Sequence, residues 1–184
     1  MPDHDSLLTM LVERSARRGN FTLASGRQST LYIDARLTTM SPDGLALIGP
    51  LALHEIDRAS WKVDSVGGLT LGADPVSYAI AYASTFTDTL IRAFTVRKET
   101  KTHGTGRLVE GPFRQGDRVV IIEDVITTGG SALRAVEVVR SFGGIVSGVL
   151  AVVDREEGGR EALEKVGLQV VALARATEIV AQME

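Results

Sequence analysis

Short apolar runs rich in β-branched residues alternate along the chain with segments of helical periodicity. Apolar runs bounded by Gly or polar residues predict buried strands, whereas a spaced apolar stripe predicts an amphipathic helix. The expected strands cover 64–69, 90–96, 118–124, 145–153 and 168–174. The expected helices cover 5–18, 42–58, 76–84, 131–142 and 160–166, and 21–37 is expected to be extended. Strands that alternate with helices indicate an α/β fold, a doubly wound, mostly parallel sheet flanked by helices.

Proline and glycine refine the helix boundaries. Ser41-Pro42 and Asp74-Pro75 each place a capping side chain before a first-turn proline, which predicts that helices begin there. Gly49-Pro50 lies inside the first of these helices and predicts a kink, because proline removes a backbone donor. Gly19 is expected to end the helix over 5–18.

The composition limits both the size of the fold and the class of partner. The 184 residues are 44% hydrophobic and 23% charged, which is enough for one buried core but not for two domains. The absence of cysteine excludes disulfides and thiolate catalysis, and the net charge of −3 does not favour nucleic-acid binding. Neither a signal peptide nor a long apolar stretch is evident, so we expect a single cytoplasmic domain, 1–184, that does not enter a membrane.

A strand, two carboxylates and a small-residue loop come together in the segment 119–131. Its sequence is Val-Val-Ile-Ile-Glu-Asp-Val-Ile-Thr-Thr-Gly-Gly-Ser. The end of the segment offers hydroxyls and unobstructed amides at the expected start of a helix, where unpaired N–H groups and the helix dipole favour an anion. Glu123 and Asp124 supply oxygen acceptors for a sugar's hydroxyls or for hydrated Mg²⁺. The segment therefore predicts a site for a phosphorylated ligand beyond the carboxyl end of a strand.

The same residues also admit a purely structural interpretation. Acidic residues before a Gly-rich turn often do no more than cap the next helix. Other nucleotide-binding motifs are missing, since the chain has no Gly-x-x-x-x-Gly-Lys-Ser/Thr and Gly104-Thr-Gly106 lacks a third glycine at Val109. P-loop and Rossmann sites are therefore not expected.

The segment 98–117 has no lasting periodicity, although its first part is strongly basic. The basic residues there are Arg97, Lys98, Lys101 and Arg107. A structureless stretch of this length is usually a loop that covers a site or an unrecognised hairpin. The charge favours a mobile catalytic loop, because cations can stabilise a leaving anion when closure excludes water.

The segment 119–131 resembles the motif by which type I phosphoribosyltransferases bind phosphoribosyl diphosphate (PRPP). In that family the two acids contact the ribose hydroxyls, and the small-residue loop surrounds the 5-phosphate. The resemblance implies PRPP binding by a continuous run of residues, Glu123, Asp124, Val125, Ile126, Thr127, Thr128, Gly129, Gly130 and Ser131.

Further segments resemble the orotate phosphoribosyltransferase family. They are 97–104 with 110–111, 21–27 with 32–34, 66–75, and 153–156. The resemblance implies an enzyme that transfers ribose 5-phosphate from PRPP to orotate in pyrimidine biosynthesis, yielding orotidine 5′-monophosphate and pyrophosphate. It also implies an N-terminal substrate segment at about 20–37, Mg²⁺ that arrives bound to PRPP without direct protein ligands, and a homodimer that shares the catalytic loop across its interface.

The resemblance assigns the catalytic loop to the diphosphate end of PRPP. The residues expected to contact the diphosphate, partly across the dimer interface, are Arg97, Lys98, Lys101 and His103. Lys101 is the first candidate for stabilising the departing pyrophosphate, and Asp124 is the catalytic candidate at the ribose. Outside this family context, His103 would more often be a surface histidine.

Two residues are expected to bind orotate. Arg155 matches the family's base-contacting arginine, and a guanidinium can donate paired hydrogen bonds to a planar anion. Thr127 can add a hydroxyl contact. The alternative for Arg155 is a surface ion pair with Glu156 or Glu157.

The chain departs from the family pattern at two positions, and two alternative functions are also considered. Many members carry lysine where this chain has Ala24 and Gly72. A purine phosphoribosyltransferase would share 123–131 but not the basic loop or the Asp-Arg-Glu strand end. A PRPP-sensing regulator on the same fold would need a basic surface or an appended nucleic-acid-binding segment, and neither is evident.

Overall fold

The structure is a computed structural model that describes residues 4–22, 28–99 and 108–183. In these ranges its centre is a six-stranded sheet with the order β5-β4-β3-β6-β7-β8. The strands are β3 Ser65–Leu69, β4 Arg92–Val96, β5 Val109–Glu110, β6 Arg118–Ile126, β7 Ile145–Asp154 and β8 Val170–Arg175. Neighbouring strands are parallel except β4 and β5, which are antiparallel. The expected α/β fold with a mostly parallel sheet is therefore confirmed.

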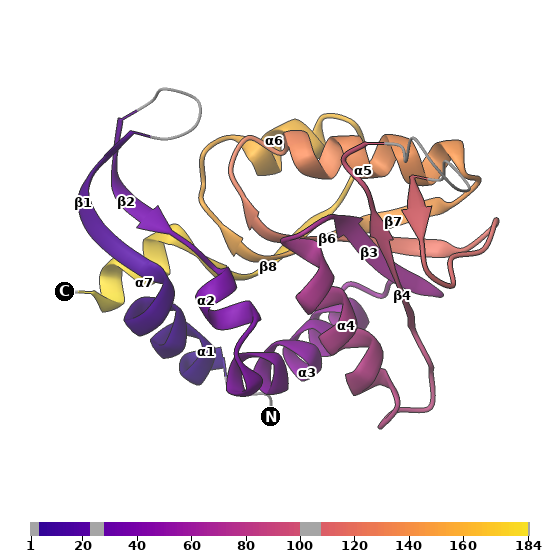
Figure 1. The fold of residues 1–184 in the computed structure, drawn as a ribbon, viewed down its shortest axis with the longest axis horizontal. Coiled ribbons are helices and arrows are strands. Elements are labelled where there is room, and N and C mark those ends of the chain that lie inside the picture. The colour runs from indigo at the N-terminus through magenta and orange to yellow at the C-terminus, as the bar shows by residue number, and fades with distance from the viewer. Residues whose placement is uncertain (1–3, 23–27, 100–107, 184) are drawn as a thin grey trace.

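Helices cover both faces of this sheet (Figure 1). One face carries α1 His4–Met10, α3 Pro42–Arg58, α4 Ala73–Ser84 and α7 Ala176–Gln182, whereas α5 Gly130–Ser141 and α6 Gly159–Glu164 cover the other. A hydrophobic core lies between the sheet and each helical layer. Within the described ranges, none of these helices combines the length and the apolar character that crossing a membrane requires.

The strand β6 contributes to both cores because its side chains alternate between the two faces. Val120 and Ile122 pack into the core beneath α3 and α4, while Val119 and Ile121 pack into the core beneath α5. All four side chains are fully buried. Burial on both faces explains why this strand appears in the sequence as an unbroken apolar run rather than an alternating one.

The order of strands reverses between β3 and β6. The chain continues from β3 to β4 on one side and from β6 to β7 on the other. β3 and β6 pair only as far as Gly67 and Ile121, whereas β6 stays paired with β7 as far as Ile126. The two central strands therefore separate near their carboxyl ends, where open α/β sheets leave a crevice for ligands.

A second, two-stranded antiparallel sheet follows the first helix. Its strands are β1 Ala16–Thr22 and β2 Gln28–Ile33. The prediction of a helix that continues to Arg18 and ends at Gly19 is wrong, because a π-helical turn ends at Ser15. Arg17 and Arg18 instead pair with β2. Their backbone groups are therefore hydrogen-bonded within a sheet rather than within a helix.

The helix α3 begins as its sequence predicts. Ser41 lies at the N-cap, and its Oγ accepts a hydrogen bond from the Gly44 backbone N–H at 3.1 Å. The helix continues through Pro50 to Arg58. The kink expected at Gly49-Pro50 remains a prediction.

The helix α4 does not begin as expected. Asp74 lies in its first turn rather than at the N-cap, which is Gly72. The Asp74 carboxylate accepts hydrogen bonds from the Thr70 and Thr95 hydroxyls at 2.6 and 2.8 Å. Because both oxygens are used in this way, Asp74 fixes the turn after β3 against β4 instead of capping its own helix.

Several short elements are not apparent in the sequence. They are α2 Arg36–Thr39, β5 and α7. β5 forms a hairpin with β4, in which the Arg97 N–H donates to the Leu108 carbonyl at 2.8 Å, so part of 98–117 is a hairpin. The residues 100–107 lie outside the described ranges. β6 also extends past its expected end at 124, because Val125 and Ile126 remain paired with β7.

Candidate active site

A cavity of about 220 Å³ opens where β3 and β6 separate. Its lining residues are Arg36, Leu69, Thr70, Leu71, Gly72, Lys98, Glu123, Asp124 and Ser131. A smaller hollow of about 50 Å³ beside it is lined by Glu123 and by the residues from Val125 to Ala132. Glu123 and Ser131 line both spaces, so the two form one continuous candidate site. A larger groove of about 520 Å³, between α3 and β8, includes none of the residues predicted for the site.

The smaller hollow surrounds the start of α5. Gly129 is the N-cap of this helix and has a φ of 81°, a left-handed conformation that favours glycine. A Cβ at Gly129 would also lie 3.0 Å from the Gly159 carbonyl oxygen. No side chain caps the helix, so the amides of its first turn are available to an anion. The predicted residues Thr127 to Ser131 are thus brought together around a phosphate-sized hollow.

Glu123 is a buried carboxyl group on the wall shared by both spaces. Its side chain is 7% exposed, and its Oε1 has no hydrogen-bond partner among the described residues. Burial, and then the neighbouring Asp124 carboxylate, raise the pKa of Glu123 to about 8. An unpaired buried carboxylate is costly, so the group takes up a proton until a ligand supplies a partner.

Asp124 lies directly over Gly72. A Cβ at Gly72 would lie only 2.4 Å from the Asp124 Oδ1 atom. A side chain at position 72, including the lysine common in the resembling family, would therefore require Asp124 to move. Burial raises the pKa of Asp124, while the hydrogen bond from the Val125 N–H and the charge of Arg36 lower it.

Arg155 follows β7 and is also buried, with 8% of its surface exposed. Its Nη2 donates to the Leu31 carbonyl and the Ser29 hydroxyl at 3.0 and 3.2 Å, and also pairs with Glu157 at 2.7 Å. The alternative of an ion pair with Glu157 is therefore partly confirmed. The pair exists, but it is buried rather than on the surface. The Arg155 Nε has no hydrogen-bond partner among the described residues.

The backbone places Arg155 beside the phosphate loop. Its N–H donates to the Ile126 carbonyl at 2.9 Å, which brings the two predicted orotate residues, Arg155 and Thr127, to neighbouring strand ends. Arg155 itself does not line either of the two spaces.

The basic residues of the predicted catalytic loop are only partly described. Lys98 lines the cavity, and its carbonyl accepts a hydrogen bond from Arg134. Arg97 lies beside Glu110, with 3.7 Å between their charged groups, and is not a lining residue. Lys101 and His103 lie outside the described residues, as does Ala24.

Sequence reasoning missed several lining residues, among them Arg36, Thr70 and Leu71. Thr70 and Leu71 lie in the segment 66–75, whose resemblance to a known family could have drawn attention to them. Arg36 follows the quoted segment 32–34 closely, but no local pattern distinguishes it from a surface arginine.

Comparison with known proteins identifies the family. No family model matches the chain. The orotate phosphoribosyltransferase of Aquifex aeolicus is 44% identical over 182 residues, covering 97% of this chain and 98% of the relative. That of Mycobacterium tuberculosis is 46% identical over 168 residues, 91% of each chain. The chain belongs to the orotate phosphoribosyltransferase family.

Solved structures of orotate phosphoribosyltransferases agree with this assignment. The M. tuberculosis enzyme in complex with PRPP has a TM-score of 0.82 and 41% identity, covering 97% of this chain and 99% of that one. Adenine phosphoribosyltransferase of Saccharomyces cerevisiae, at 21% identity and a TM-score of 0.68, shows a shared fold alone. The resemblance and the enzyme class predicted from the sequence are confirmed, and the purine alternative has no comparable support.

Across 4–22, 28–99 and 108–183, no cluster of three or more His, Asp or Glu side chains could bind a metal ion. The expectation that Mg²⁺ arrives with PRPP stays a prediction.

Glu123→Gln should stabilise the protein more at pH 8.5 than at pH 5. Between the ordinary carboxyl pKa of 4.5 and the folded value of about 8, the unfolded chain ionises while the folded protein keeps its proton. The free energy of unfolding of the wild type therefore falls by on the order of 1 kcal/mol or more as the pH rises through this window. Glutamine cannot ionise, so the variant does not lose this stability. Thermal denaturation across this pH range measures the difference.

Glu164→Gln, which changes an exposed carboxylate on α6, is the matched control. A stability difference between Glu123→Gln and wild type that does not grow with pH would mean that Glu123 is already ionised in the free protein.

Proposed function

We propose that this chain transfers ribose 5-phosphate from PRPP to the N1 nitrogen of orotate, giving orotidine 5′-monophosphate and pyrophosphate in pyrimidine biosynthesis. The observation that carries the proposal is the continuous site at the start of α5, in a chain 44% identical to an orotate phosphoribosyltransferase over nearly its whole length. The relative solved with PRPP bound supports the same substrate.

The β6–α5 turn is the proposed site for the ribose 5-phosphate part of PRPP. Amides and hydroxyls of Thr127 to Ser131 surround the hollow, where the helix dipole favours the 5-phosphate. Val125 and Ile126 contribute backbone to the same wall. Glu123 and Asp124 are then placed to bind the ribose hydroxyls, which gives the unpaired Glu123 oxygen a partner.

The reaction breaks the bond between ribose C1 and a diphosphate oxygen, and forms the bond between C1 and N1 of orotate. The electron pair of the broken bond leaves with pyrophosphate, N1 of orotate loses its proton to solvent, and positive charge develops on the sugar as in glycoside chemistry. The chain's tasks are to align the two substrates and to stabilise the leaving anion. Arg97, Lys98, Lys101 and His103 are the proposed contacts of the diphosphate, with Lys101 as the principal group at the leaving pyrophosphate.

Arg155 and Thr127 are the proposed orotate contacts. The Arg155 guanidinium is already oriented by the Leu31 carbonyl and by Glu157, so little side-chain freedom is lost on binding. Its buried Nε can donate to the orotate carboxylate or to a ring carbonyl.

Mg²⁺ is the proposed cofactor, carried by PRPP, where it would offset the charge of the diphosphate. The cavity lining is compatible with a hydrated Mg²⁺ ion. It presents the acidic side chains of Glu123 and Asp124, and the described residues do not contain the three or more clustered ligands of a protein metal site. The cytoplasmic location and the single domain remain predictions of the sequence.

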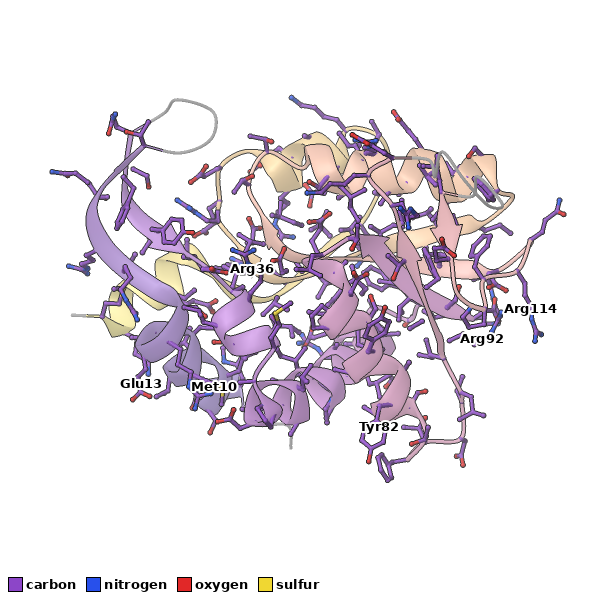
Figure 2. The ribbon with its side chains drawn as sticks, in the orientation of Figure 1. Met10, Glu13, Arg36, Tyr82, Arg92 and Arg114 are labelled. Atoms are coloured by element: carbon purple, nitrogen blue, oxygen red, sulfur yellow. The ribbon has the colours of Figure 1, made fainter. Side chains whose placement is uncertain are left out.

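A homodimer is proposed from an aromatic face on and beyond α4. Its members are Tyr78, Tyr82, Phe86 and Leu90, which are 55%, 68%, 76% and 70% exposed. Tyr82 points away from the body of the protein (Figure 2), and its ring packs edge-on against that of Phe86. Exposed aromatic side chains that pack together are typical of an interface. The Tyr78 hydroxyl lies 3.2 Å from that of Thr95 on β4, the strand that leads to Lys98. A partner bound to this face would lie next to the catalytic segment.

Among orotate, uracil, hypoxanthine, guanine and adenine, orotate alone should support rapid pyrophosphate release from PRPP with Mg²⁺. Arg155→Ala should raise the KM for orotate by roughly tenfold or more and that for PRPP much less, because a charged hydrogen bond contributes about 1.5–3 kcal/mol. Steady-state kinetics with each substrate varied in turn measure both constants.

Arg155→Lys separates charge from geometry, since lysine keeps the cation but cannot donate in parallel. Folding of both variants is checked by thermal denaturation, because Arg155 also contacts β2. Equal changes in the two KM values would remove Arg155 from the orotate site.

Asp124→Asn should lower kcat/KM for PRPP roughly tenfold or more without early melting, because it removes a charged acceptor for the ribose hydroxyls. Asp57→Asn, at an exposed position on α3, is the matched control. A variant that melts early and still binds PRPP normally would make Asp124 a structural residue.

A mixed dimer of Lys101→Ala and Asp124→Ala chains should regain activity if each site uses the partner's loop. Each variant alone should be inactive, Lys101→Ala mainly through kcat, because a cation at the leaving group acts in the transition state. In the mixed dimer one site contains both intact residues and the other contains neither. Co-expression with two purification tags measures the recovery, and verified heterodimers without activity would exclude a shared loop.

A further inference from the structure

Both acidic and cationic residues line the cavity next to the phosphate hollow. The acids are Glu123 and Asp124, and in the described part of the chain the lining cations are Arg36 and Lys98. Lys98 belongs to the segment already proposed for the diphosphate, whereas Arg36 has no role in the site described so far. We propose that Arg36 binds the diphosphate of PRPP, an inference that rests on the proposed function.

The order of the two spaces determines which part of PRPP reaches Arg36. The hollow at the start of α5 suits the 5-phosphate, and Glu123, which lines both spaces, suits the ribose together with Asp124 in the cavity of about 220 Å³. The rest of an extended PRPP molecule must then continue into that cavity, whose lining includes Arg36. The diphosphate, which has the highest charge density in the molecule, therefore meets a guanidinium there.

The guanidinium of Arg36 is held in place before any ligand binds. Arg36 begins α2 (Figure 2), and its Nε and Nη2 donate to the two carboxylate oxygens of Asp34 at 2.8 and 2.9 Å. The Arg36 backbone N–H also donates to Asp34 at 3.2 Å. A guanidinium has five donors, so this paired contact leaves others free for phosphate oxygens.

An acid in the same lining lies near Arg36. Asp124 occupies the space over Gly72, which has no side chain. The Asp34 hydrogen bonds mainly raise the pKa of Arg36, and the nearby Asp124 charge raises it further. Burial raises the pKa of Asp124, and the Arg36 charge partly offsets that rise. Half of the Arg36 side chain, 49%, remains exposed, so the guanidinium is accessible from the cavity.

Isothermal titration calorimetry with two separate probes tests the assignment. Arg36→Ala should weaken binding of pyrophosphate with Mg²⁺ about tenfold or more, and should leave ribose 5-phosphate binding nearly unchanged, because the two probes occupy different parts of the site. Arg36→Lys should lie between Arg36→Ala and wild type, since it keeps the charge without the paired donors. In steady-state kinetics, the KM for PRPP should rise and that for orotate should change little.

Arg14→Ala is the matched control. Arg14 donates to both oxygens of Asp43 at 2.8 and 2.6 Å, in the same kind of paired contact, but does not line the cavity. Its removal should affect neither probe.

Three results would overturn the assignment. Pyrophosphate binding to Arg36→Ala that matches wild type would exclude the contact. An equal loss for both probes would make Arg36 a structural support of the whole site, and a rise in the orotate KM alone would move Arg36 to the base site. Failure of the wild type to use orotate would instead contradict the proposed function, and the pyrophosphate titration would still decide the role of Arg36.

Discussion

The separation of β3 from β6 is the constraint on which the rest of the site depends. The two strands pair as far as Gly67 and Ile121, and β6 then continues beside β7 alone. Glu123 and Asp124 therefore face a space rather than a neighbouring strand, and the turn after β3 forms the opposite wall. Because the order of strands reverses at this point, the crevice is a consequence of the topology and does not need a specialised loop.

Electrostatics explain why this crevice favours a ligand that is both a polyol and a polyanion. Burial leaves Glu123 with an unpaired oxygen and a raised pKa, so the group gains from a hydroxyl donor. The uncapped start of α5 favours a phosphate on one side. Arg36 and Lys98 favour a second anionic group in the adjoining cavity. PRPP has this arrangement, because its ribose hydroxyls lie between a 5-phosphate and a diphosphate.

The predicted site residues that the structure brings together are those that lie close together along the chain. The run from Glu123 to Ser131 lines the two adjoining spaces because a strand and the helix that follows it determine its shape locally. Asp74 was misassigned because its partners, Thr70 and Thr95, come from a turn and from a different strand. Arg36 was missed for the same reason, since only the folded chain brings α2 to the end of β6.

We propose that Glu123 is protonated in the free protein and responds to a ligand at the proposed ribose site. A carbon-13 NMR titration of protein labelled at glutamate, with the resonance assigned by Glu123→Gln, measures its pKa directly. The pKa should be about 8 in the free protein and should change clearly when ribose 5-phosphate saturates the site. A pKa near the ordinary 4.5 that is unaffected by ribose 5-phosphate would contradict it.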